Sequence, residues 1–157
     1  MEPQALLQTF APLIAAAANL DLSDPASARA ELVRRFDPTS PEALSLNATL
    51  KEHLAAGRIA ERGELPVCWG RVTKALPESS DLSIDVVHMN GPGPRHRHPR
   101  GEVNYCIALE GEPTFDGQPA GWVVMPPDSV HVPTVAGGRM LIVYLLPGGE
   151  MDFLKDD

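Results

Sequence analysis

The chain has 157 residues, which is enough for one domain with a sizeable core, and 43% of its residues are hydrophobic. It carries 13 basic and 21 acidic residues, and the net charge of −8 argues against nucleic acid or an anionic membrane surface as a partner. The 2 cysteines, Cys68 and Cys106, are too few for a disulfide framework, so we expect both to be reduced.

An apolar stretch at residues 10–20 is the candidate for a targeting or membrane-spanning segment. No Lys or Arg precedes Arg29, so this stretch lacks the basic start of a signal peptide. It is also too short to cross a bilayer. We therefore expect a cytoplasmic protein without a membrane partner.

Residues 1–62 have the sequence patterns of helices. Apolar residues recur at spacings of three and four, which predicts a first helix with one apolar stripe. The stripe consists of Leu6, Leu7, Phe10, Leu13, Ile14 and Ala17. Asp24-Pro25 and Ser40-Pro41 each combine a favoured N-cap with a proline at the first helical position, so we expect two more helices. We expect this segment to pack on the remainder of the chain.

After Gly63, short β-rich runs alternate with turns rich in Gly and Pro. The candidate strands are Leu65–Leu76, Leu82–Met89, Glu102–Leu109, Pro113–Phe115, Gly121–Met125, Val130–Thr134 and Arg139–Leu146. Short strands at this spacing predict an antiparallel sandwich or barrel over residues 63–157. The last run is apolar at nearly every position, so we expect both of its faces to be covered, with the helices as the outer cover.

A cluster of metal-ligating residue types follows the pattern H-x-H-x3-E. His96 and His98 point to the same side of an extended strand, about 6.5–7 Å apart, and Glu102 has the same parity. A tight turn at residues 126–128 returns His131 toward the same place. Three imidazoles and one carboxylate suit a divalent transition metal.

These residues resemble the two motifs of the cupin superfamily, whose members fold as small jelly-roll β-barrels. The four ligand positions match, whereas the spacings of Gly91 and Gly111 differ and Asp128 stands where a turn glycine is expected. The resemblance implies a mainly β cupin fold with an N-terminal α-helical segment. It also implies one bound divalent metal, for which we favour Fe2+ or Mn2+ and keep Zn2+, Ni2+ and Co2+ open.

A wider resemblance connects three runs of the sequence to small bacterial 4-hydroxylaminobenzoate lyases. The runs are GELPVCWGR from Gly63, IDVVHMNGPG from Ile84 and ALEGEPTFDG from Ala108, and the likeness spans residues 1–153. It implies a conversion of 4-hydroxylaminobenzoate to 3,4-dihydroxybenzoate (protocatechuate) and ammonia, a step in nitroaromatic degradation. The partner of the protein would then be a small aromatic carboxylate substrate.

Three arginines crowd beside the expected ligands in an otherwise acidic chain. Arg95, Arg97 and Arg100 indicate a local anion site, with a solvated loop as the alternative. Arg100 shares the parity of the two nearest ligands, so it is the preferred partner of a substrate carboxylate. Arg95 and Arg71 are the next candidates.

Four further residues are candidates for catalysis or substrate binding. Strand alternation places Asn104 on the same face as Glu102, where it would line a cavity. His88 lies on an apolar strand face and is either a core histidine or a pocket acid–base group. Trp69 is either a core residue or a platform for the aromatic substrate. Glu102 either stays on the metal or carries a proton during the reaction.

Two other functions are compatible with the same ligand set. Three histidines and a glutamate also hold Fe2+ for oxygen chemistry, so a cupin dioxygenase acting on an aromatic acid is one alternative. A non-enzymatic, small-molecule-binding cupin with a structural metal is the other. The resemblance to cupins also implies a homodimer, which an outward apolar strand face at Val103, Tyr105 and Ile107 would permit.

Overall fold

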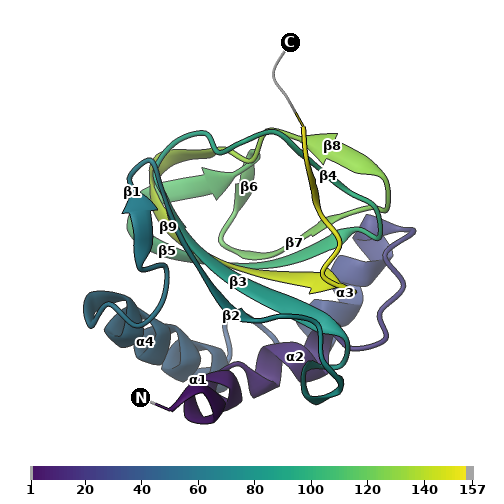
Figure 1. The fold of residues 1–157 in the computed structure, drawn as a ribbon, viewed down its shortest axis with the longest axis horizontal. Coiled ribbons are helices and arrows are strands. Elements are labelled where there is room, and N and C mark those ends of the chain that lie inside the picture. Colours follow the sequence, from purple (N-terminus) through teal and green to yellow (C-terminus); the bar gives the residue numbers. More distant parts are fainter. Residues whose placement is uncertain (1, 155–157) are drawn as a thin grey trace.

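The computed structural model describes residues 2–154, with helices in the first third of the chain and strands in most of the rest (Figure 1). The helices are α1 (Pro3–Thr9), α2 (Ala11–Ala17), α3 (Pro25–Arg35) and α4 (Pro41–Ala55), and a short 3-10 turn, η1, spans Pro77–Ser79. Within residues 2–154, no helix is long and apolar enough to cross a membrane.

The helix starts follow the capping signals of the sequence. The side chains of Asp24 and Ser40 each accept a hydrogen bond from the backbone N–H of the third residue further on, and a proline follows each cap. The prediction of one helix over residues 6–17 is wrong, because α1 and α2 are separate helices that meet at Phe10. Pro12 has no backbone N–H to continue the ladder of the first helix.

The strands form two antiparallel sheets. They are β1 (Arg62–Glu64), β2 (Val67–Thr73), β3 (Leu82–Met89), β4 (His96–His98), β5 (Glu102–Phe115), β6 (Gln118–Pro119), β7 (Gly121–Met125), β8 (Ser129–His131), β9 (Val135–Pro147) and β10 (Asp152–Phe153). The larger sheet has the order β1-β2-β3-β9-β5-β6, with β7 also paired to β5, and the smaller sheet has the order β10-β4-β8. This mainly β, cupin-like jelly roll with N-terminal helices confirms the expected fold class, although its ladders between residues 2 and 154 do not close into one barrel.

Most predicted strands are present, with shifted ends. Strands β3 and β7 have the predicted bounds. The runs predicted at residues 102–109 and 113–115 form one strand, β5, because an irregularity in its pairing with β9 after Gly111 accommodates Pro113. The other strand ends lie a few residues from their predicted positions.

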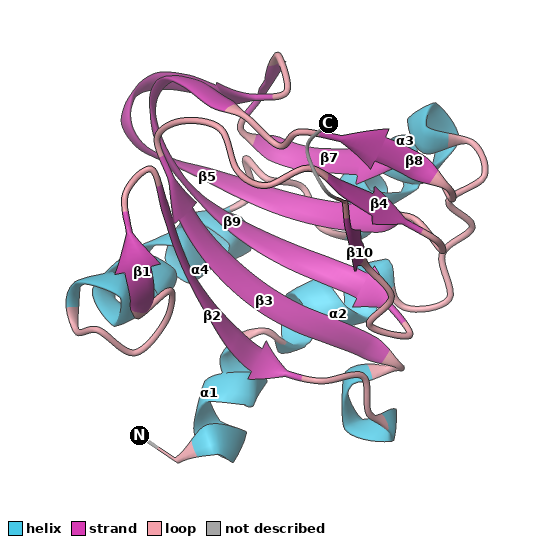
Figure 2. Ribbon diagram, turned by 45° about the horizontal axis from the view of Figure 1, so that its top comes forward, coloured by secondary structure: helices cyan, strands magenta, loops and turns pink. Residues whose placement is uncertain are grey.

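The larger sheet lies between two layers. Helices α1, α2 and α4 cover one of its faces, and β4 and β8 lie on the other side (Figure 2). One hydrophobic core between helices and sheet includes Leu32 of α3, Leu50 of α4 and Trp122 of β7. The helices therefore cover this face of the sheet. Helix α4 ends at Ala55 and β1 begins at Arg62.

The few polar groups on the helix-covered face have partners. The Trp122 Nε1–H donates a hydrogen bond to the Phe36 carbonyl at 2.8 Å. The Tyr105 hydroxyl donates to Asn47 Oδ1 of α4, also at 2.8 Å. Because these buried donors are paired, their hydrogen bonds to the helical region offset the cost of removing the donors from water.

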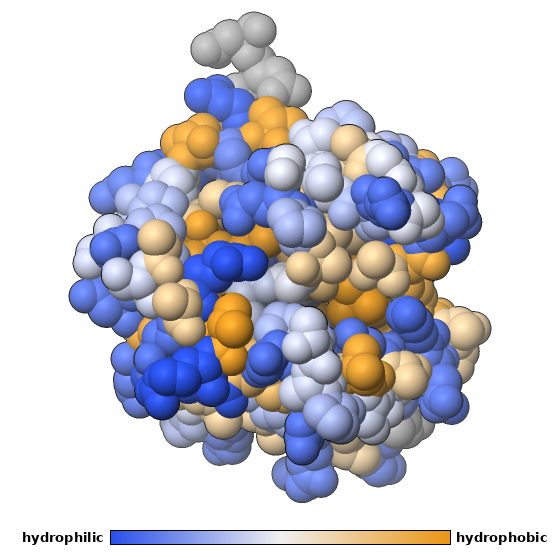
Figure 3. Space-filling model, turned by 180° about the vertical axis from the view of Figure 1, so that it is seen from behind, coloured by the Kyte–Doolittle hydropathy of each residue, from blue (hydrophilic) through white to orange (hydrophobic). Residues whose placement is uncertain are grey.

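The apolar strand face that we expected to support a dimer lies inside the protein. Val103, Tyr105 and Ile107 are buried in the core shared with the helices. On the surface seen from behind, apolar residues lie in separate patches between polar ones (Figure 3). The argument from this strand face is therefore wrong, and the homodimer itself stays a prediction.

Candidate metal centre

Short strands hold the four predicted ligand residues. Alternation along β4 directs His96 and His98 into the protein, where both are buried, and directs Arg97 outward. Strand β8 pairs with β4 so that His131 lies opposite His96. Glu102 begins β5 and is fully buried.

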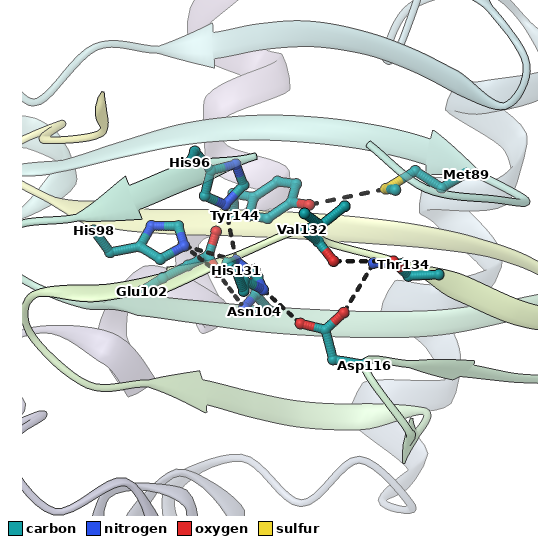
Figure 4. Close-up of polar contacts among 10 residues, drawn as sticks. All are labelled: Met89, His96, His98, Glu102, Asn104, Asp116, His131, Val132, Thr134 and Tyr144. Atoms are coloured by element: carbon teal, nitrogen blue, oxygen red, sulfur yellow. Dashed lines mark hydrogen bonds and ion pairs between the residues drawn. The ribbon is translucent and has the colours of Figure 1, made fainter. Parts of the chain in front are cut away.

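The ligand atoms of these four side chains converge (Figure 4). His131 Nε2 lies 2.8 Å from His96 Nε2 and 2.8 Å from His98 Nε2. Glu102 Oε2 lies 3.2 Å from His98 Nε2 and 3.6 Å from His131 Nε2. All four ligand atoms lie within 4.8 Å of one another, so the residues surround a single point.

The polar atoms around this point fit a divalent cation. Glu102 Oε2 accepts a hydrogen bond from Asn104 Nδ2 at 3.0 Å, whereas Glu102 Oε1 has no hydrogen-bond partner among residues 2–154. A buried carboxylate is costly unless it is paired or coordinates a metal. Three imidazole nitrogens and one carboxylate oxygen are a typical donor set for divalent iron, manganese, cobalt, nickel or zinc. The cluster therefore fits a transition metal of this class.

Burial controls the protonation of the cluster. Burial lowers the pKa of His96 to about 4 and the pKa of His98 to about 3, so both imidazoles are neutral near pH 7. Burial also raises the pKa of Glu102. Burial opposes the charged form of His131 as well, but its hydrogen bonds to Asp116 and Glu102 raise its pKa to about 9. His96 and His98 thus each offer a free lone pair at neutral pH. The protonation of His131 depends instead on its contacts with Asp116 and Glu102.

Asp116, which the sequence analysis missed, holds His131 in place. Its Oδ2 lies 2.5 Å from His131 Nδ1, and its Oδ1 accepts a hydrogen bond from the Thr134 N–H at 2.8 Å (Figure 4). This contact keeps the proton on Nδ1 and leaves Nε2 facing the other ligands. In the sequence, Asp116-Gly117 indicates only a turn, and its spacing from His131 carries no metal-site signal.

A cavity of about 690 Å³ opens beside His96. Its walls are mainly apolar and come from β2, β3, β9 and the segment around β10. Polar side chains on the walls include Arg62, Arg71, Asp85 and Tyr144. An apolar cavity of this volume with a few polar groups is typical of a small-molecule site.

Two of the predicted substrate-binding residues, Trp69 and Arg71, line this cavity. Trp69 is 46% exposed, and the Arg62 guanidinium lies 5.2 Å from the centroid of its ring, so the structure favours a platform over a core residue. Arg71 Nε lies 3.0 Å from Asp85 Oδ1, and Arg71 Nη2 lies 3.4 Å from Asp85 Oδ2. Because a guanidinium has five N–H donors, this pair leaves donors of Arg71 free for a ligand.

The structure does not bring Arg100 or Arg95 to the cavity wall. The parity argument for Arg100 fails because Gly101, with a φ of 88°, turns the chain between β4 and β5. Arg100 Nη1 lies 3.5 Å from Asp81 Oδ2, and its Nε lies 3.6 Å from Glu150 Oε2. The expected contact of Arg100 with a substrate carboxylate therefore loses its geometric support.

His88 lies on the opposite face of the larger sheet from the cavity. Its neighbours Val87 and Met89 line the cavity, so strand alternation turns His88 toward the other side. His88 Nε2 lies 2.7 Å from Arg139 Nη1, and burial, followed by the charge of Arg139, lowers the pKa of His88. The geometry therefore does not support the alternative in which His88 is a pocket acid–base group.

The sequence is similar to curated lyases and to a solved cupin. The 4-hydroxylaminobenzoate lyase of Pseudomonas putida is 30% identical over 86 residues, which are 52% of this chain and 49% of that protein. The 4-hydroxylaminobenzoate lyase of Nocardioides sp. (strain LMS-CY) is 30% identical over 91 residues, which are 53% of this chain and 54% of that protein. The chain thus spans about half the length of the curated relatives it matches.

Among solved structures, an RmlC-like cupin protein from Ralstonia eutropha is 17% identical, with a TM-score of 0.45 over 59% of this chain and 62% of that chain. The family model of PnbB, 4-hydroxylaminobenzoate lyase, matches residues 9–153. This match begins at Thr9, the last residue of α1, and covers every later helix and strand, including the four clustered ligand residues. The chain therefore belongs to the 4-hydroxylaminobenzoate lyase family.

Proposed function

We propose that this protein is a metal-dependent lyase that converts 4-hydroxylaminobenzoate and water to 3,4-dihydroxybenzoate and ammonia. The observation that carries the proposal is the buried cluster of three histidines and one glutamate beside an apolar cavity of about 690 Å³. Membership of a family of this name supports the choice of substrate. An aromatic acid of one ring is small enough for such a cavity.

The cavity wall offers a site for each part of an aromatic acid. Trp69 presents an exposed ring to the cavity, and Val87 and Leu146 add apolar contacts for a benzene ring. Arg71 has free N–H donors for the carboxylate, and Asp85 holds its guanidinium in place. Arg71 therefore replaces Arg100 as the preferred carboxylate-binding residue.

A row of paired residues connects this carboxylate site with the cluster. Across the larger sheet, Arg71 pairs with Asp85, Asp85 with Tyr144, and Tyr144 with Asn104. Adjacent strands lie about 4.8 Å apart, so the row spans roughly 14 Å between its first and last Cα atoms. Asn104 in turn contacts Glu102. The row supports a bound benzoate whose carboxylate lies near Arg71 and whose para substituent points toward the cluster.

The residues of the cluster have distinct roles in this proposal. His96, His98, His131 and Glu102 would hold the metal, which when bound supplies a Lewis acid and lowers the pKa of a coordinated water. Asp116 keeps the Nδ1 proton on His131, and Asn104 orients the Glu102 carboxylate. The free Oε1 of Glu102 is the atom that would accept a proton if the glutamate acts as a base.

The proposed reaction is redox-neutral. The N–O bond of the hydroxylamine breaks and its oxygen leaves as water, while a second water adds to the neighbouring ring carbon. A third water then replaces the nitrogen, which leaves as ammonia, and the ring regains its aromaticity by losing a proton. Two waters are consumed and one is released, so the net change is addition of one water and loss of one ammonia.

Turnover without oxygen tests the proposal. We expect the purified, metal-loaded protein to form 3,4-dihydroxybenzoate and ammonia in equal amounts from 4-hydroxylaminobenzoate under anaerobic conditions. A strict requirement for O2 would instead identify a dioxygenase. Binding of the acid without any turnover would identify a small-molecule-binding cupin. Either result contradicts the lyase.

A further inference from the structure

Tyr144 of β9 has a buried hydroxyl without a strong hydrogen-bond partner. The residue is 4% exposed and lines the cavity. Its hydroxyl contacts Met89 Sδ at 3.9 Å (Figure 4). A thioether sulfur is a weak acceptor, so this contact replaces little of the hydrogen bonding that the hydroxyl has in water.

Apart from the ligand residue His96, the other charged side chains on the cavity wall are differently placed. Arg71 and Asp85 form an ion pair with each other. The Arg62 guanidinium lies over the Trp69 ring and is mostly exposed. Tyr144 thus differs from them as a buried neutral donor on the cavity wall, whose hydroxyl points toward Met89 and has its hydrogen-bonding capacity largely unused. Buried hydroxyl groups in proteins normally have a partner, and here a ligand in the cavity is the group that can supply one.

The position of Tyr144 indicates which part of a ligand it contacts. It pairs with Asp85 on one side and with Asn104 on the other, so it lies between the carboxylate site at Arg71 and the cluster. A benzoate bound in the proposed orientation, with its carboxylate at Arg71 and its far end toward the cluster, would pass the Tyr144 ring. Burial holds the pKa of Tyr144 well above its usual value, which keeps the hydroxyl protonated as a donor.

We propose that the Tyr144 hydroxyl donates a hydrogen bond to the polar atom that a bound benzoate carries para to its carboxylate. This inference rests on the proposed function for the substrate class and for the orientation of the ring. It assigns Tyr144 as a residue that selects benzoates with an oxygen or nitrogen acceptor at the para position over benzoates without one. In 4-hydroxylaminobenzoate, that acceptor is the hydroxylamine group.

Two stable acids that differ by one para oxygen test this assignment. The dissociation constants of 4-hydroxybenzoate and benzoate are measured by calorimetry on the metal-loaded wild type and on Tyr144→Phe. We expect the wild type to bind 4-hydroxybenzoate roughly three- to tenfold more tightly than benzoate. Tyr144→Phe should abolish this preference and leave the affinity for benzoate unchanged, because the substitution removes a single oxygen atom.

Tyr105→Phe is the matched control, because Tyr105 lies next to Tyr144 in the sheet but on the helix-covered face. It should keep the wild-type preference. A preference that survives in Tyr144→Phe overturns the assignment while the substrate class stands. A wild type that binds neither acid overturns the substrate class together with the assignment, so the two failures are distinguishable. Thermal unfolding of each variant confirms that the protein measured is folded.

Discussion

Alternate residues of the same strands point to opposite faces of the larger sheet, and the two faces differ in how their buried polar groups are paired. Along β5, Val103 and Tyr105 pack under the helices, whereas Glu102 and Asn104 point to the cluster. On the helix-covered face, the buried polar groups of Tyr105 and Trp122 have hydrogen-bond partners. On the cavity face, Glu102 Oε1 and Asn104 Oδ1 have none among the residues that the structure describes.

This difference indicates that the helix-covered face mainly stabilises the fold and that the cavity face mainly serves function. Fully paired, close-packed groups lower the free energy of the folded chain, and the helix-covered face consists of such groups. Buried polar atoms without partners raise it, and they are kept where a ligand or metal can satisfy them. Substitutions on the two faces should therefore have separable effects, on unfolding for one face and on metal and turnover for the other.

The largest effect on function is expected from the cavity face. The double variant His96→Ala/His98→Ala removes two of the four ligands, so we expect it to lose bound metal and turnover together. Because neither side chain belongs to the core under the helices, cooperative unfolding should remain. Metal analysis and a thermal melt are the two measurements. A full complement of metal in the double variant would contradict the assigned site.

The largest effect on stability is expected from the helix-covered face. Trp122→Ala removes a buried ring that lies edge-on to Tyr105, at 5.0 Å between centroids, and should cost about 3–5 kcal/mol in the free energy of unfolding. Tyr105→Phe is the milder test, because it removes the hydrogen bond to Asn47 at a cost of about 1 kcal/mol. Urea unfolding measures both. Metal content per folded chain should equal that of the wild type.

A smaller effect is expected behind the cluster, at Asp116. Asp116→Asn weakens the contact that holds His131 Nδ1, so metal affinity should fall by roughly 10–100-fold. Asp128→Asn is the matched control, since Asp128 is an exposed partner of Arg97 and, like Asp116, has a positive φ that asparagine tolerates. Competition against a metal-binding indicator gives both affinities. Equal affinities in the two variants would show that Asp116 does not position His131.

The smallest of these effects is expected at the carboxylate site. Arg71→Ala removes the cation and leaves Asp85 facing the ligand, so KM for 4-hydroxylaminobenzoate should rise by roughly tenfold with little change in kcat. Arg100→Ala should change KM less than twofold, because Arg100 lies outside the cavity. Initial rates for the two variants decide between them. A larger effect of Arg100→Ala would restore the carboxylate contact inferred from the sequence.

Patterns among neighbouring residues in the sequence predicted helix starts and the side of a strand to which side chains point. The caps at Asp24 and Ser40 mark helix starts, and strand parity places His96 and His98 on one side of β4. These features need only neighbouring residues, which is why they follow from sequence.

The features that the sequence did not predict depend on turns and on distant pairing. The alternation of side chains along a strand did not place Arg100 correctly, because the chain turns at Gly101 and the alternation does not continue through a turn. The face of His88 depends on which side of the larger sheet the helices cover. Asp116 reaches His131 only because the chain folds back between them, so no spacing in the sequence announces their contact.

Removal and return of the metal test the central claim most directly, because the account places the chemistry on the cavity face at a metal held by three histidines and Glu102. The protein is stripped with a chelator and then titrated anaerobically with Fe2+ or Mn2+ while bound metal and turnover of 4-hydroxylaminobenzoate are measured together. We predict that turnover is lost on stripping, returns in proportion to bound metal, and reaches its maximum at about one ion per chain. Full turnover by the metal-free protein would contradict the account.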